Sequence, residues 1–483
     1  MPTQRIDMHT HVFNVRYLPV EGIIRSRGVP DLIAKGLAKV LNARTGDDIE
    51  PSAPLFAAAV AADAQGADEL PAVHAQTSGE AIDQLASGTP KELIDDPDVR
   101  AALDHPDVRV ALAAMQGLHV GELQALAMNH VESADVEPQF AALYGQLSRM
   151  EPASGIFETG AEYLRWFNFL THSERVIMQT LLATYGDDVH LFIHHMMDME
   201  AYYHHGRCYY DFVNDQLPRM RRLVNASGGR LLTFVAYSPD RPNDLNVVRR
   251  ALDDTDAVGV KFYPPNGYRP DEARHDALYT ELVHRDAPLF AHCTPTGMEA
   301  TPGSGANSNP TYWANVLGRF PSLRLCLGHA GGDEPWFGLA PWDGSYAAQA
   351  VALATRYDNV YLEFGYHDHI LDPAVREGFI ARLSGLIAAN AGLEKKIMYG
   401  TDWHMIEKIN NHQEYFHDFA AAFADPRLSS YSDAFFYTNA VSYLRLPQFR
   451  DSRAAINGVD DPVVGNLDRV IAVAEQMGID HNP

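Results

Sequence analysis

The fold is decided by two short stretches of the sequence, PLFAHC at residues 288–293 and LRLCLGH at residues 323–329. Each stretch is rich in apolar residues and too short for a typical helix, as expected of a parallel strand that is buried on both faces. Parallel strands need a crossover between them, and the residues between these two stretches are enough for one helix. The pair therefore predicts one strand–helix–strand unit.

The same pattern recurs along most of the chain. From the second strand onward, the gaps between strand ends run from 25 residues (237 to 262) to 42 residues (195 to 237), which fits one helix in each crossover. Eight such units predict an α/β fold, the (β/α)8 TIM barrel, rather than an open sheet. The other strands are expected at residues 5–12, 189–196, 231–237, 258–263, 360–364 and 396–401, and helices at 244–251, 272–284, 347–357 and 373–389.

The first crossover departs from this rhythm, because about 170 residues separate the first strand from the second. Apolar residues repeat every three and four positions in its later part, so we expect a large, mostly helical insertion. It leaves the barrel at the C-terminal end of the first strand, the face where barrel enzymes keep their active sites. The predicted division is a catalytic barrel (1–14 and 187–447), a helical cap (15–186) and a C-terminal extension packed on the barrel (448–483).

Composition limits the class of partner. Hydrophobic residues make up 46% and charged residues 21% of the 483 residues, which is typical of a globular protein with a sizeable core. The net charge of −25 repels the phosphates of nucleic acids and anionic lipid headgroups. We therefore expect a small-molecule substrate and no nucleic-acid or membrane partner; a homo-oligomer is compatible with this composition.

Cysteine usage and the N-terminus bear on the compartment. The chain has only 3 cysteines, an odd and sparse number that argues against a disulfide framework. Charged and polar residues at positions 5, 7, 9 and 11 interrupt any apolar signal-peptide core, and no apolar run is long enough to span a membrane. The expectation is a soluble, cytoplasmic protein.

Candidate metal ligands occur on the first predicted strand. Asp7, His9 and His11 are spaced by two residues, so all three side chains are expected on one face, toward the barrel interior. Two neighbouring imidazoles can bind one metal ion, although a single His-x-His is weak support, because polar residues often end a strand. Further candidates therefore matter.

Three more candidates follow other strands. His292 and His329 end two of the predicted strands, and Asp402 directly follows the last one. Each alone could be an ordinary polar residue at a strand end. Because the C-terminal ends of all strands of a barrel meet at one mouth, a shared site explains all of them together.

At these motifs the chain resembles the metal-dependent amidohydrolase superfamily, in particular its amidohydrolase-related branch. The resemblance covers the expected barrel, not the insertion. It implies a divalent metal held by His9, His11, His292 and Asp402, with His329 as a second-metal ligand or a proton-handling residue. The matching motifs are IDMHTH (6–11), PLFAHC (288–293), LGHAGG (327–332), YGTDW (399–403) and Asn439-Ala440 ahead of Leu444.

The ligand types agree with that implication. Imidazole and carboxylate ligands suit zinc first, and also iron or manganese. Coordination lowers the pKa of water from 15.7 to about 7 and so provides hydroxide at neutral pH. Asp402 would then serve as the general base, and His329 would polarise the substrate oxygen or hold a second ion.

Lys261, at the end of the fourth predicted strand, decides between one and two metal ions. In binuclear members of the superfamily, a carbamylated lysine from this strand bridges the two ions. If Lys261 has this role, His292 and His329 belong to the second ion, while His9, His11 and Asp402 stay with the first. The alternative is an ordinary ammonium group that pairs with a carboxylate beside a single metal ion.

The sequence leaves three functions open. The first is a hydrolase that uses metal-activated water on an amide, ester, lactone or related bond, and Lys261 favours it. The second is a metal-dependent non-oxidative decarboxylase of the same branch, and the third a non-catalytic binding barrel. Substrate-facing candidates are His194, His195, Asp198, Arg207, Asn266, Tyr268, Asp333, Trp336 and Trp342.

Overall fold

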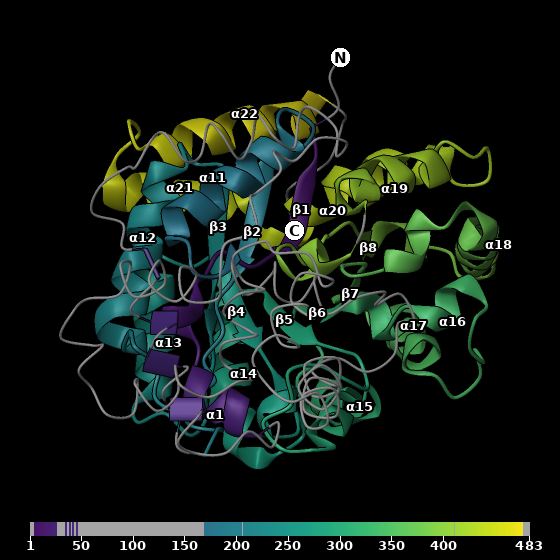
Figure 1. Ribbon diagram of the computed structural model, residues 1–483. Coiled ribbons are helices and arrows are strands. Elements are labelled where there is room, and N and C mark those ends of the chain that lie inside the picture. The colour runs from purple at the N-terminus through teal and green to yellow at the C-terminus, as the bar shows by residue number, and fades with distance from the viewer. Residues whose placement is uncertain are drawn as a thin grey trace, which may run out of the picture.

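A computed structural model describes residues 4–26, 34–35, 38–39, 41–42, 45–46, 169–204, 206–409 and 411–476. Within these ranges, eight strands form one parallel sheet in the order β1 to β8, surrounded by helices (Figure 1). The predicted (β/α)8 TIM barrel is therefore confirmed. The strands are β1 Ile6–Thr10, β2 Leu191–His195, β3 Leu231–Ala236, β4 Gly259–Phe262, β5 Leu289–His292, β6 Leu325–Gly328, β7 Val360–Glu363 and β8 Ile397–Met398.

Each crossover between consecutive strands contains a helix. The helix predicted at residues 373–389 forms with these bounds, and the one predicted at 272–284 begins at Asp276, after a single 3-10 turn at Ala273–His275. The crossover helices are α11 Glu174–Tyr185, α12 Leu217–Ala226, α13 Asp244–Asp253, α14 Asp276–Arg285, α15 Thr311–Arg319, α17 Tyr346–Arg356 and α18 Pro373–Ala389. Shorter or later helices are α1 Val20–Ser26, α16 Glu334–Phe337, α19 Tyr415–Phe423, α20 Asn439–Leu444, α21 Leu446–Asn457 and α22 Pro462–Gln476.

The barrel is closed by backbone hydrogen bonds between β1 and the chain that leaves β8. The amide of Met8 donates to the carbonyl of Tyr399 at 3.0 Å, and the amide of Asp402 donates to the carbonyl of His9 at 2.8 Å. The amide of His11 also donates to the carbonyl of Trp403. This closure brings Asp402 next to His9 and His11, although the residues are almost 400 positions apart in the sequence.

A β-bulge in β1 changes which side chains face the interior. Asp7 pairs with Phe192 and Thr10 with His194, so three steps along β1 match two steps along β2. Asp7 therefore shares the face of Phe192, whose ring contacts Tyr185 of α11 in the helix layer. The expectation that Asp7 points inward with the two histidines is wrong, because the extra residue breaks the strict alternation of side chains.

Asp7 has a structural role in that position. Its carboxylate accepts hydrogen bonds from the amides of His9 and Thr401, both at 3.0 Å, and from the Thr401 hydroxyl at 2.6 Å. These bonds join the bulge of β1 to the residue before Asp402. Asp7 thus fixes the backbone from which His9 and Asp402 project.

Two phenylalanine rings fill the barrel interior. A Cβ on Gly259 would lie 2.5 Å from the Phe234 ring, and a Cβ on Gly328 would lie 2.5 Å from the Phe290 ring. Only glycine leaves room for the rings at these inward positions. The rings form an apolar floor, because His195 packs against both of them and Lys261 lies 4.4 Å above the centre of Phe290.

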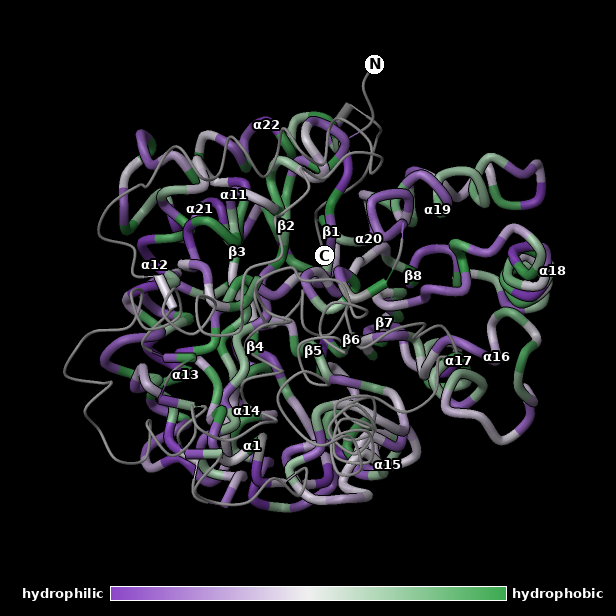
Figure 2. Tube along the Cα trace, viewed as in Figure 1, coloured by the Kyte–Doolittle hydropathy of each residue, from purple (hydrophilic) through white to green (hydrophobic). Residues whose placement is uncertain are grey.

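The C-terminal helices cover the other end of the barrel. Apolar residues of α20 and α22 form one buried cluster with Met8, Leu191 and Leu232 of the strands. In Figure 1, α22 lies beside the start of β1, and Figure 2 shows hydrophobic strands inside a more polar periphery. The mouth on the opposite side carries the C-terminal strand ends.

Little of the insertion lies in the described residues. They include a 3-10 turn at Val15–Tyr17, helix α1 and helix α11, whose buried residues Ile177, Met178 and Leu181 pack in the main core. Apart from a few residues at 34–46 and 169–173, the rest of the predicted cap lies outside the described residues, so its position over the mouth and its boundaries stay predictions. None of the helices in the described ranges has the length and hydrophobicity needed to cross a membrane.

The packing of α22 gives a prediction about stability. Leu467 is fully buried in the cluster that closes the barrel, so we expect Leu467→Ala to lower the free energy of unfolding by about 2 to 5 kcal/mol. Val459→Ala is the matched control, since Val459 is 69% exposed. Urea unfolding measures both, and equal midpoints for the two variants would contradict the packing of α22 on the barrel.

Candidate metal centre

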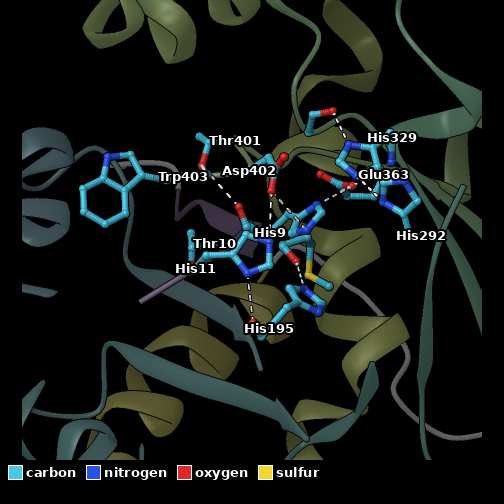
Figure 3. Close-up of polar contacts among 12 residues, drawn as sticks. His9, Thr10, His11, His195, His292, His329, Glu363, Thr401, Asp402 and Trp403 are labelled. Carbon is cyan, nitrogen blue, oxygen red and sulfur yellow. Dashed lines mark hydrogen bonds and ion pairs between the residues drawn. The ribbon is translucent and has the colours of Figure 1, made fainter. Parts of the chain in front are cut away.

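All six predicted metal and catalytic residues line one cavity of about 410 Å³ at the C-terminal mouth. Figure 3 shows His9, His11 and Asp402 next to one another, with Glu363, His292 and His329 grouped beside them. The residues come from five strands or the turns that follow them, as the barrel topology requires. The six are His9, His11, Lys261, His292, His329 and Asp402.

The first group consists of His9, His11 and Asp402. Oδ1 of Asp402 lies 3.3 Å from Nε2 of His9 and 3.1 Å from Nε2 of His11. The Nδ1 atom of His11 lies 2.9 Å from the carbonyl oxygen of His195, which can only accept a hydrogen bond. The hydrogen of His11 is therefore on Nδ1, and the lone pair on Nε2 faces Asp402.

His9 is oriented in the same way. Its Nδ1 lies 3.2 Å from Oε2 of Glu363, and its Nε2 lies 3.2 Å from the amino group of Lys261. A lysine ammonium can only donate, so Nε2 accepts and Nδ1 carries the hydrogen that binds Glu363. The lone pairs of both histidines thus converge on the position of Asp402.

The second group is the pair His292 and His329. Nε2 of His292 lies 2.8 Å from the carbonyl of Thr296, and Nδ1 of His329 lies 2.9 Å from the carbonyl of Gly365. These contacts place the hydrogens on the outer nitrogens. The inner nitrogens, Nδ1 of His292 and Nε2 of His329, are 3.1 Å apart and face each other with lone pairs.

The imidazoles are neutral at pH 7. Burial and the charge of Lys261 lower the pKa of His11 and of His292 to about 3, and burial with the neighbouring His292 lowers that of His329 to about 3. Burial, followed by Lys261, also holds the pKa of His9 well below its usual value. Neutral imidazole is the form that binds metal ions.

This arrangement fits divalent metal ions. Lone pairs that face each other at about 3 Å with no hydrogen between them repel, and a cation between them turns that repulsion into coordination. His9, His11 and Asp402 offer one set of ligand atoms, and His292 with His329 offers a second pair. The two sets are adjacent, since the rings of His9 and His329 lie 4.9 Å apart.

Lys261 lines the same cavity, and its amino group lies 3.2 Å from Nε2 of His9 in the first set. Its side chain is buried, and its charge acts on both histidine groups, on Asp402 and on Glu363. Burial lowers the pKa of Lys261 to about 8, so the neutral amine is more accessible than in an exposed lysine. This position is compatible with a bridging carbamate, whereas a plain ammonium would repel metal ions in both sets.

Glu363 is a site residue that the sequence reasoning missed. It ends β7 and is fully buried, and its Oε2 accepts hydrogen bonds from His9 and from the amide of His329 at 3.1 Å. One carboxylate therefore orients a ligand from each set. The sequence does mark this residue: Glu363 is a polar residue near the end of the apolar stretch VYLEF (360–364), just as His292 is near the end of PLFAHC.

Most of the candidates for substrate contact lie elsewhere. His194 accepts a hydrogen bond from the amide of Val12, Asp198 forms an ion pair with Arg241 at 2.5 Å, and Arg207 is exposed. His195 lies beneath the site, where its carbonyl orients His11. Among these candidates only Asp333 lines the cavity. Asn266, Tyr268, Trp336 and Trp342 also lie outside its lining.

Comparison with known families gives one match. The family model described as amidohydrolase matches residues 204–446, about half of the chain. The matched region includes β3 to β8 and therefore Lys261, His292, His329, Glu363 and Asp402. No curated protein matches the chain.

Solved structures also align with the chain at low identity. An uncharacterised TIM-barrel protein from Bordetella bronchiseptica is 18% identical, with 56% of this chain and 81% of that chain covered and a TM-score of 0.40. A 5-carboxyvanillate decarboxylase from Sphingomonas paucimobilis is 13% identical, with coverage of 64% and 96% and a TM-score of 0.39. A putative 2-pyrone-4,6-dicarboxylic acid hydrolase from Pseudomonas putida is 14% identical, with coverage of 56% and 87% and a TM-score of 0.40.

The geometry predicts that His9→Ala combined with His11→Ala lowers the metal content of the purified protein, because two of the three ligand atoms of the first set are lost. Elemental analysis at equal protein concentration measures the loss. His284→Ala with His417→Ala is the control, since both residues lie on barrel helices away from the cavity. Unchanged metal content in the His9 and His11 variant would contradict the site.

Proposed function

The chain belongs to the metal-dependent amidohydrolases, and on this basis we propose that it is a hydrolase that uses metal-activated water. The substrate would be a small organic molecule with an amide, ester, lactone or related bond. The observation that carries the proposal is the convergence of four neutral imidazoles, Asp402 and Lys261 on one cavity. Zinc is the metal we favour, because the ligands are imidazole and carboxylate.

The charges around the cavity support hydrolysis over decarboxylation. Within the described residues, the lining contains Asp333, Glu334, Asp368 and Asp402 but only one cationic side chain, Lys261, and no arginine. A decarboxylase must bind a substrate carboxylate, and arginine is the side chain best suited to that task. The described lining therefore offers no arginine for a substrate carboxylate, which favours a substrate without one.

The residues of the chain divide the work of such a reaction. A divalent metal bound at these ligands would act as a Lewis acid and lower the pKa of water. Asp402 would accept the proton of the attacking water at its carboxylate and pass it to the leaving group. Glu363 and the carbonyl of His195 would hold the imidazoles of His9 and His11 in their orientation throughout.

The second histidine pair has its own role in the proposal. His292 and His329 would hold a second ion, since their facing lone pairs cannot hydrogen-bond to each other while both are neutral. Lys261 would then bridge the two ions as a carbamate: the ammonium first loses one proton, and the neutral Nζ then forms a bond to the carbon of CO2 and releases a second proton. The product is an anionic group with two oxygens in place of a buried cation.

We predict that Asp402→Asn lowers turnover by at least about a hundredfold, because the amide cannot accept the proton from water. A panel of esters, lactones, amides and aromatic carboxylic acids would first identify a substrate of the wild type. Asp358→Asn, an exposed site on the far side of β7, is the control. Wild-type turnover in the Asp402 variant would remove Asp402 from the mechanism, and activity only as CO2 release would replace hydrolysis by decarboxylation.

We also predict that Lys261 takes up isotopically labelled bicarbonate as a carbamate, visible as a carbonyl resonance by NMR. Lys261→Met should lose this resonance and about one metal ion per chain, whereas Lys395→Met, at an exposed position, should retain both. If the wild-type protein shows no carbamate resonance and contains one metal ion per chain, the alternative holds: an unmodified lysine beside a single metal ion.

A further inference from the structure

A second cluster of potential ligands lies on two loops of the cavity wall. Asp333 follows the 3-10 turn His329–Gly331 after β6, and Asp368 and His369 begin the 3-10 turn Asp368–Leu371 after β7. Asp333 and Asp368 both line the cavity, together with the residues of the metal centre. None of the three residues has a role in the proposed hydrolysis.

The three side chains converge. The amide of His369 lies 3.3 Å from Oδ2 of Asp333, and Nδ1 of His369 contacts the same oxygen. Oδ1 of Asp368 lies 4.0 Å from Nδ1 of His369, so the carboxylate of Asp368 points into the cluster. One ligand atom from each of the three residues lies within 4.8 Å of the others.

While both carboxyl groups are ionised, three oxygens of this cluster receive no hydrogen bond from the described residues. They are Oδ1 of Asp333 and both carboxylate oxygens of Asp368, whose side chain has no exposed surface. In the same part of the chain, neither carboxylate forms an ion pair with lysine or arginine, and the imidazole of His369 contacts both carboxylates. An uncompensated carboxylate in such a place is strongly unfavourable.

Two arrangements could remove this penalty. Burial raises the pKa of Asp333 to about 7 and that of Asp368 well above its usual value, so the two groups could share a proton. A shared proton, however, satisfies only two of the three oxygens. A cation placed among the three residues can contact oxygens of both carboxylates and the imidazole at once.

We propose that Asp333, Asp368 and His369 bind a divalent cation at a site separate from the metal centre. Two carboxylates and one imidazole are ligands that suit zinc or manganese. The ion would join the loop after β6 to the loop after β7 and so stabilise this wall of the cavity. The site goes beyond the proposed hydrolysis and does not depend on it.

Zinc binding in a variant without the first ligand set tests the site. In the His9→Ala and His11→Ala background, protein loaded with zinc and dialysed should lose about one further ion per chain when Asp368→Asn is added. Asp343→Asn, which removes an exposed carboxylate from the same region, should leave the zinc content unchanged. His369→Gln is a second route to the same loss if the Asp368 variant does not fold.

The readout is metal content and not turnover, so failure of this site is distinguishable from failure of the proposed hydrolysis. Zinc should also raise the midpoint of thermal unfolding in the background variant, and this rise should shrink with Asp368→Asn. Equal zinc content with and without Asp368→Asn and His369→Gln would overturn the proposal and leave a proton-sharing carboxyl pair.

Discussion

The site depends on hydrogen bonds that hold the outer nitrogens of four buried imidazoles. The carbonyls of His195, Thr296 and Gly365 and the carboxylate of Glu363 fix the outer hydrogens, so every lone pair points into the cavity. Burial keeps the rings neutral, and neighbouring lone pairs therefore repel. Such an arrangement is costly in an empty pocket and favourable around a cation, which is the physical reason to assign a metal centre.

The barrel supplies this geometry through its closure. Asp7 accepts a hydrogen bond from the amide of Thr401, which holds β1 against the turn after β8, and one from the amide of His9 within the bulge. The bulge lets His9 and His11 face inward while Asp7 faces outward. Below the site, Phe234 and Phe290 form an apolar floor over Gly259 and Gly328. The floor limits solvation of Lys261, which makes a bare ammonium beside metal ions unfavourable.

Much of this architecture was predictable from the sequence. Short apolar strands at regular spacing indicate a barrel, and polar residues at their C-terminal ends indicate one shared mouth. The direction of Asp7 was not predictable, because a bulge in β1 turns its side chain outward and no local sequence pattern marks that bulge. The contacts of loop residues were not predictable either. Position in the chain alone does not show that Asp198 pairs with Arg241, or that Asp333 lines the cavity. Glu363, in contrast, was predictable in the same way as His292, because both are polar residues at the C-terminal end of an apolar strand.

Coordination of metal by the converging lone pairs can be seen directly in a crystal structure of the zinc-loaded protein, with anomalous diffraction at the zinc edge. We expect a peak about 2.0 to 2.2 Å from Nε2 of His9, Nε2 of His11 and a carboxylate oxygen of Asp402, and a second at Nδ1 of His292 and Nε2 of His329. No anomalous peak among these atoms, with the imidazoles bridged by water alone, would contradict this coordination.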